Sequence, residues 1–152
     1  MVKGNLTYWR GESFYINPSS RCINDCLFCV RNYGDGVFGF DLMLDGDPTP
    51  DELVNAIDAT WKPEFDDVAI VGFGEPLLNL DAVLAGIRKI KELSNVKVRM
   101  NTNGQGLLIH PTRDVPQELA DAGLDRVQIS LNAPNPDTYF QLCKPKMGRG
   151  AY

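Results

Sequence analysis

Helical and extended patterns alternate along most of this 152-residue chain. Two short β-runs, residues 6–9 and 13–16, flank a turn at Gly11, and three helix–strand pairs follow. The predicted strands of these pairs are 68–71, 96–100 and 126–131. Such alternation implies parallel strands joined by right-handed helical crossovers. We therefore predict an α/β fold, an open doubly wound sheet or part of a (β/α) barrel, that follows a short N-terminal β-hairpin.

Local signals mark the helices between these strands. A capping-box pattern in segment 49–52 predicts a helix from Pro50 to about Trp61. The second helix carries one apolar stripe, formed by Leu80, Val83, Leu84, Ile87 and Ile90. The third helix spans 115–122, with proline near its start and glycine just past its end. Residues 33–48, rich in Gly and Asp, predict an irregular loop.

Polar, glycine-rich or cysteine-rich segments follow the strands that we expect to be parallel. They are Cys22–Cys29, Gly72–Pro76, Asn101–Gly104 and Ser130–Ala133. In parallel α/β sheets, ligands bind at the C-terminal strand ends. Glu75 at such an end suits an ammonium group, and the two-residue period puts Ser130 and Asn132 on one face of their strand. The agreement among the four ends predicts one shared site.

Three of the four cysteines, Cys22, Cys26 and Cys29, form a Cys-x₃-Cys-x₂-Cys segment. In a reducing compartment, clustered cysteines indicate metal ligands or redox groups rather than disulfides. The spacing favours an iron–sulfur cluster over zinc. A zinc site would need a fourth ligand, for which the candidates are His110 and Cys143.

Length and composition are those of one globular domain, residues 1–152. Hydrophobic residues make up 43% of the chain, and the formal net charge of −5 disfavours non-specific binding to nucleic acid or to an anionic membrane. No run approaches the ~18 apolar residues of a membrane-spanning helix. The first residues also lack the apolar core of a signal peptide. We therefore expect a cytoplasmic protein with no membrane association.

Several segments resemble the radical S-adenosylmethionine (radical SAM) superfamily. The cysteine motif, with Phe28 just before its last cysteine, resembles the superfamily signature. Gly72–Pro76 is similar to its GGEP motif, with Phe73 in place of the middle glycine. The segments "FCVRN", "GFGEP", "NTNG", "LIHPTRDV" and "SLNAPNPDTYFQLCKP" together resemble the TatD-associated radical SAM proteins, from about residue 8 to the end.

This resemblance implies an enzyme with two cofactors, a 4Fe–4S cluster and S-adenosylmethionine. Three cysteines would bind three irons, and the fourth iron would bind the amino and carboxylate groups of S-adenosylmethionine. One electron from a donor such as flavodoxin or ferredoxin would then cleave the cofactor to methionine and a 5′-deoxyadenosyl radical, which abstracts hydrogen from an unknown substrate. The resemblance also implies a parallel-stranded partial (β/α) barrel, of which this chain carries the first four βα units.

Roles follow from motif position under this resemblance. The expected iron ligands are Cys22, Cys26 and Cys29. Four sets of residues are expected to contact S-adenosylmethionine. Phe28 would lie at the adenine, and the methionyl ammonium would be bound by Gly72, Phe73, Gly74 and Glu75. Ser130 and Asn132 would bind the ribose or the carboxylate, and Thr102 and Asn103 would line the opening of the same site. Ser130 and Asn132 are uncharged where several relatives carry Asp or Lys, so the group that each one binds stays open.

For each of three further residues, the sequence leaves two interpretations open. His110, the only histidine, is either structural or a proton-transfer or substrate contact. Cys143 is either a packed thiol or one that faces the substrate. Arg31 either acts on the cluster or a substrate anion, or forms a surface ion pair.

The family barrel is longer than this chain. The fourth crossover helix would begin near residues 148–152, and about 50 residues of the family pattern are absent, so a longer chain or a second chain is expected to complete the barrel. The alternative to an enzyme is a binding module stabilised by zinc or by an iron–sulfur cluster, a degenerate relative that keeps the scaffold.

Overall fold

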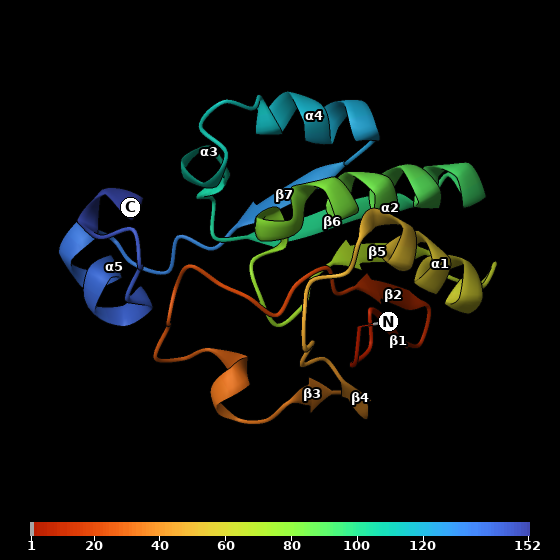
Figure 1. Cartoon of the computed structure of the whole chain (residues 1–152), viewed down its shortest axis with the longest axis horizontal. Helices are drawn as coiled ribbons and strands as arrows, with labels where there is room; N and C mark the ends of the chain where they lie inside the picture. The colour runs from red at the N-terminus through yellow and green to blue at the C-terminus, as the bar shows by residue number, and fades with distance from the viewer. Residues whose placement is uncertain (1) are drawn as a thin grey trace.

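A five-stranded sheet forms the centre of the computed structural model, which describes residues 2–152 (Figure 1). Its strands are β1 (Thr7–Arg10), β2 (Ser13–Ile16), β5 (Asp67–Ile70), β6 (Lys97–Thr102) and β7 (Arg126–Ile129). Their order across the sheet is β1-β2-β5-β6-β7. β1 pairs antiparallel with β2, and every other neighbour pair is parallel. The predicted N-terminal hairpin and parallel α/β sheet of a partial barrel are thereby confirmed.

Helices α1 (Pro50–Thr60), α2 (Leu80–Leu93) and α4 (Val115–Ala122) lie on one side of this sheet (Figure 1). The core forms where they meet it. Fully buried strand residues such as Val68, Ile70 and Val98 pack with Leu53 of α1 and Ile87 of α2. Buried and more exposed residues alternate along β6, so every second residue of this strand, Asn101 among them, lies on the face of the sheet opposite to the core.

The three predicted helices are confirmed, and α1 and α4 have their expected ends. Thr49 and Glu52 form the complete capping box at the start of α1. All five residues of the predicted apolar stripe on α2 are buried. Gly123 ends α4 in the left-handed conformation, with φ of +101°, which glycine adopts without steric cost.

Two segments differ from the sequence-based expectations. Residues 33–48, predicted as irregular, contain a small hairpin of β3 (Gly36–Val37) and β4 (Phe40–Asp41). A further helix, α5 (Pro136–Cys143), follows β7, whereas the sequence analysis placed the start of a fourth helix near residue 148. Asn135 caps α5 by accepting from the Thr138 N–H at 2.9 Å, a helix-start signal that the sequence carries.

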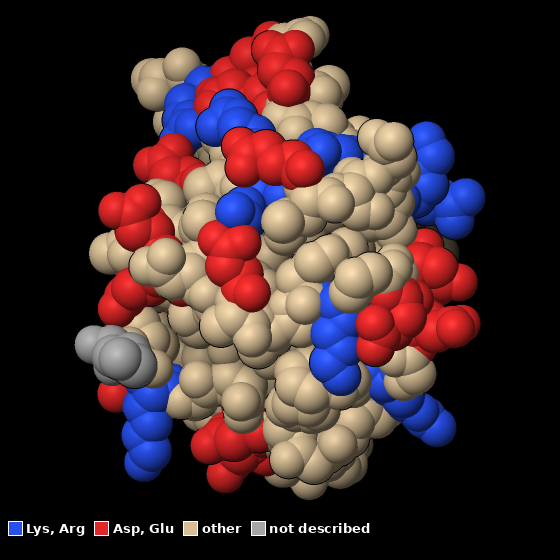
Figure 2. All heavy atoms as spheres, turned by 90° about the vertical axis from the view of Figure 1, so that its right-hand side faces the viewer, with Lys and Arg blue, Asp and Glu red and all other residues tan. Residues whose placement is uncertain are grey.

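Charged residues of both signs intermix on the side of the molecule where β5, β6 and β7 begin (Figure 2). Ion pairs there join neighbouring elements, for example Arg99 to Asp67 at 2.9 Å and Lys97 to Asp125 at 2.9 Å. Within residues 2–152, no helix combines the length and the apolar character that crossing a membrane requires.

Candidate functional site

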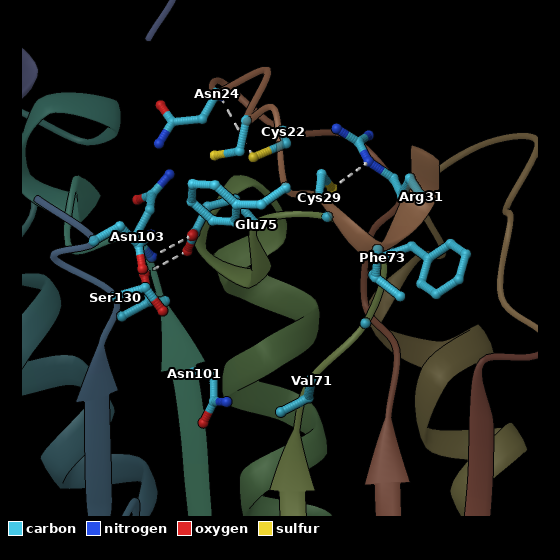
Figure 3. A pocket seen from close by; sticks show the side chains of 17 residues that line it. Cys22, Asn24, Cys29, Arg31, Val71, Phe73, Glu75, Asn101, Asn103 and Ser130 are labelled. Carbon is cyan, nitrogen blue, oxygen red and sulfur yellow. Dashed lines mark hydrogen bonds between the residues drawn. The ribbon is translucent and has the colours of Figure 1, made fainter. Parts of the chain in front are cut away.

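A cavity of about 260 Å³ lies at the C-terminal ends of the parallel strands. Every residue that the sequence analysis assigned to the site lines it, although the residues come from segments far apart in the chain. They are Cys22, Cys26, Phe28, Cys29, Gly72, Phe73, Gly74, Glu75, Thr102, Asn103, Ser130 and Asn132. The close-up shows cysteines on one wall, with Glu75, Asn103 and Ser130 facing the space beneath them (Figure 3).

The cysteine wall is a loop between β2 and a short 3₁₀-helix, η1 (Val30–Asn32). Cys22, Cys26 and Cys29 are each partly exposed. The Asn24 N–H donates to Cys22 Sγ, and Arg31 Nε donates to Cys29 Sγ, both at 3.4 Å (Figure 3). Burial raises the pKa of the Cys22 thiol, and burial beside Cys143 raises the pKa of Cys26 to about 12. Metal binding therefore has to displace protons from this wall.

The two residues considered as a fourth zinc ligand do not line the cavity. Cys143 is fully buried on the far side of Cys26, in a small cluster with Ala133 and Tyr139. His110 Nε2 lies 2.6 Å from the carbonyl oxygen of Leu77. Among the described residues, no group of three or more His, Cys, Asp or Glu side chains is arranged to hold a single metal ion. The thiols of Cys22, Cys26 and Cys29 line one wall of the cavity, a donor set that fits a thiolate-bound cluster with one open iron.

Glu75 forms the floor opposite the cysteines and is only 3% exposed. Its Oε1 accepts from Thr102 Oγ1 at 2.6 Å and from the Leu77 N–H at 3.1 Å, and its Oε2 accepts from the Asn103 N–H at 2.7 Å. Burial raises the pKa of this carboxyl group, while those three hydrogen bonds oppose the shift. The Glu75 N–H also donates to the Arg21 carbonyl at 2.8 Å, which ties this loop to the cysteine loop.

Close backbone packing explains the glycines of the Gly72–Pro76 segment. A Cβ on Gly72 would lie 1.9 Å from Asn17 Oδ1, and a Cβ on Gly74 would lie 2.2 Å from the Arg21 carbonyl oxygen. The residue between them has room for a ring, because Phe73 is buried against Tyr8 and Leu42. The departure from the GGEP pattern is thus accommodated in a hydrophobic cluster beside the cavity, which Phe73 also lines.

Unpartnered buried polar atoms gather around this cavity. Within residues 2–152, the buried side-chain atoms without a hydrogen-bond partner are Asn24 Oδ1, Asn101 Oδ1, Asn103 Nδ2 and Gln105 Oε1. Asn24, Asn101 and Asn103 line the cavity. Buried polar groups normally have partners, so these atoms indicate a ligand that both donates and accepts hydrogen bonds. The sequence analysis did not name Asn24 and gave Asn101 no role of its own, although it placed Asn101 in the polar segment that follows its strand.

Ser130 and Asn132 line the cavity, but the reason given from the sequence is wrong. β7 ends at Ile129, so the two residues do not share a strand face. Asn132 has φ of +58°, in the left-handed region, and the chain turns there. The Ser130 N–H donates to the Thr102 carbonyl at 2.8 Å, which keeps Ser130 beside β6.

Comparison with known proteins agrees with this geometry. A model of the radical SAM superfamily matches residues 16–152. The chain belongs to the radical SAM superfamily. The cofactors of this superfamily are a 4Fe–4S cluster and S-adenosylmethionine, and the cysteine wall and the polar floor fit that pair.

Three relatives show how far the similarity extends. GTP 3′,8-cyclase of Limosilactobacillus fermentum is 33% identical over 130 residues, covering 85% of this chain and 36% of the relative. Probable GTP 3′,8-cyclase of Methanocaldococcus jannaschii is 32% identical over 133 residues, covering 88% and 40%. Probable dual-specificity RNA methyltransferase RlmN of Synechococcus sp. is 31% identical over 133 residues, covering 82% and 36%. The radical SAM chain therefore spans no more than two-fifths of these relatives.

Proposed function

We propose that this chain is the cluster- and cofactor-binding part of a radical SAM enzyme. Cys22, Cys26 and Cys29 would hold three irons of a 4Fe–4S cluster, and S-adenosylmethionine would fill the remaining cavity. When bound and reduced by one electron from a donor, this pair would supply methionine and a 5′-deoxyadenosyl radical that abstracts a substrate hydrogen. The observation that carries the proposal is the joining of two distant loops, through Glu75 and the Arg21 carbonyl, around one cavity with three thiols.

The residues of the floor would orient S-adenosylmethionine. Glu75 and the backbone beside Gly72 and Gly74 would bind the methionyl ammonium, since a carboxylate and carbonyl groups accept its hydrogen bonds and all three residues line the cavity. The hydrogen bonds that Leu77, Thr102 and Asn103 donate to the Glu75 carboxylate fix it in one orientation. Thr102 acts mainly through that carboxylate, because its hydroxyl group donates to Glu75.

The polar residues farther along the cavity would bind the nucleoside half of the cofactor. Asn101 and Asn103 each present an unpartnered side-chain atom, and Ser130 and Asn132 lie on the same rim. Phe28, about half exposed at the cysteine wall, is available to pack on adenine. Arg31 donates to Cys29 Sγ, and such a hydrogen bond raises the reduction potential of a cluster.

The narrower assignments are also proposals. We place the chain among the TatD-associated radical SAM proteins on the segments quoted above, and in the cytoplasm because clustered thiols stay reduced there. Further βα units, from a longer chain or a second chain, would complete the barrel. The names of the relatives refer to GTP and to RNA, so a nucleotide or nucleic-acid base is the first substrate class to test.

The cluster is tested by substituting Cys26→Ala, with Cys143→Ala as a matched control. We expect the wild type and Cys143→Ala to take up about four irons per chain on anaerobic reconstitution and to show broad absorbance near ~400 nm. Cys26→Ala should lose most of this iron, because two thiolates hold a cluster poorly. Iron and sulfide analysis gives the content, and mass spectrometry of 5′-deoxyadenosine after dithionite gives the cleavage. Stoichiometric zinc without iron uptake would overturn the proposal.

A further inference from the structure

Cys143 is the cysteine that the proposed function does not use. It is the last residue of α5, is fully buried and does not line the cofactor cavity. Its small cluster with Ala133 and Tyr139 packs against Cys26. Cys26 therefore lines the cofactor cavity on one side and contacts a second cysteine on the other.

Backbone hydrogen bonds hold the two cysteines beside each other, where the end of α5 meets the cysteine loop. The Asp25 N–H donates to the Cys143 carbonyl, and the Leu27 N–H donates to the Leu142 carbonyl, both at 2.9 Å. Chain segments paired by such bonds run about 5 Å apart. A disulfide needs about 4.4–6.8 Å between its two Cα atoms, so a bond between Cys26 and Cys143 requires little movement of either segment.

The contacts of the sulfur atoms single out Cys26 among the three loop cysteines. Cys26 Sγ lies 3.8 Å from the Cys143 carbonyl oxygen. Burial is the main cause of the raised pKa of Cys26, and the Cys143 thiol, through its charge and a side-chain hydrogen bond, contributes more to it than Cys22 or Cys29. The other two sulfurs accept hydrogen bonds, Cys22 Sγ from a backbone N–H and Cys29 Sγ from a guanidinium group.

We propose that Cys26 and Cys143 are a modification site, at which a reversible disulfide forms in the cluster-free chain. The inference rests on the proposed function, in which Cys26 binds iron. The oxidant is a low-molecular-weight disulfide such as oxidised glutathione. Cys26 sulfur attacks one sulfur of the oxidant and releases one glutathione; Cys143 sulfur then attacks Cys26 and releases the second. Two electrons pass from the cysteine pair to the oxidant, and the two thiol protons end on the released glutathione molecules.

The disulfide would switch the iron site off until a reductant opens it again. Only the thiols of Cys22 and Cys29 remain on the cavity wall, and two thiolates hold a cluster poorly. Burial keeps the Cys26 thiol protonated near neutral pH, so the reaction is slow. Over hours, exchange among the cysteines lets their geometry decide which disulfide persists.

The test maps the disulfide in the full 152-residue chain. The protein is stripped of metal, reduced, and equilibrated for hours with mixtures of reduced and oxidised glutathione, after which free thiols are alkylated. Cleavage before Asp25 and after Phe28, by an aspartate-specific protease and chymotrypsin, separates the three loop cysteines for mass spectrometry. Transfer of a cluster from an iron–sulfur carrier protein, without added thiol, measures the remaining capacity to bind iron.

We expect the bond between Cys26 and Cys143 to be the main disulfide of the oxidised wild type. Cluster transfer to this form should fail and should return after treatment with dithiothreitol. Cys143→Ser should need about tenfold more oxidised glutathione than the wild type to lose half of its cluster transfer, because it lacks the thiol positioned behind Cys26. Cys22→Ser, the control with one loop thiol fewer, should still form the bond between Cys26 and Cys143 at the wild-type glutathione ratio.

A main disulfide within the loop, such as one between Cys22 and Cys29, would overturn the inference. Equal loss of cluster transfer in wild type and Cys143→Ser would do the same. The mapping of the wild type needs no substitution, so it decides the question even if a variant is less stable. Failure of the proposed function has a different signature, since the fully reduced wild type would then accept no cluster, whichever disulfide forms on oxidation.

Discussion

At the scale of a single residue, Glu75 connects three segments of the chain. Its carboxylate accepts hydrogen bonds from Leu77, Thr102 and Asn103, and its N–H donates to Arg21. The strand-end position of this residue indicated a ligand contact from the sequence. Its bracing of the β6 end and the cysteine loop depends on contacts between residues far apart in sequence, which no local pattern reveals. The residue therefore has a structural role beside the proposed contact to the cofactor.

Replacing Glu75 with glutamine should destabilise the protein even without any cofactor. An amide has one acceptor oxygen, so at least one of the three donors on the carboxylate loses its partner in a buried site. We expect a loss of about 2 kcal/mol in the free energy of unfolding of the cluster-free protein, measured by urea titration. Glu92→Gln, an exposed substitution on α2, is the control. Equal stability of the two variants would show that the bracing contributes nothing.

At the scale of helices and strands, the local sequence signals predicted the features that lie within a single element. The capping box of α1, the apolar stripe of α2 and the glycine at the end of α4 were all confirmed, because each feature lies within one helix. The β3–β4 hairpin was missed since each of its strands has only two residues, too few to show a period. The site at Ser130 and Asn132 was placed correctly for a wrong reason, because the sequence did not show that β7 ends at Ile129.

The start of β7 depends on one carboxylate that joins three elements. Asp125 accepts from Lys91 of α2 at 2.6 Å, from Lys97 of β6 at 2.9 Å and from the Val98 N–H at 2.8 Å. The Lys91 hydrogen bond, followed by that from Val98, holds the pKa of Asp125 well below its usual range. A carboxyl group whose pKa is lower in the folded state stabilises the fold above its unfolded pKa, near 4, and loses that contribution as the pH falls further.

Asp125→Asn should therefore cost stability in a pH-dependent manner. Near neutral pH we expect a loss of about 1 kcal/mol, a modest value because the side chain is partly exposed and its ion pairs are screened. The difference between wild type and variant should shrink as the pH falls from about 5 to about 3, because the carboxyl group of the unfolded wild-type chain takes up a proton there while the folded carboxylate stays charged. Urea titrations across that range measure it. Asp66→Asn, the same substitution at an exposed position before β5, is the control; a constant difference for Asp125→Asn would refute this account.

At the scale of the whole molecule, the sheet has an exposed apolar edge. Val127, Ile129 and Leu131, in and just after the edge strand β7, are 44%, 61% and 54% exposed. Leu107 and Leu108 of α3 (Gly106–Ile109) are exposed as well, and they line one shallow depression with Ile129. An unpaired strand with exposed apolar side chains invites pairing with another chain.

The 152-residue chain should therefore self-associate through β7, and Ile129→Lys should suppress this association. A lysine on an edge strand opposes strand-to-strand pairing through charge repulsion and the cost of burying an ammonium group. Sedimentation velocity between about 10 and about 200 μM should show severalfold less oligomer for Ile129→Lys than for the wild type. Leu93→Lys, which changes an exposed leucine at the end of α2, is the matched control and should associate as the wild type does. Iron uptake should be equal in all three proteins, because Ile129 does not line the cofactor cavity. If both lysine variants lower association to the same extent, net charge rather than the β7 edge governs it.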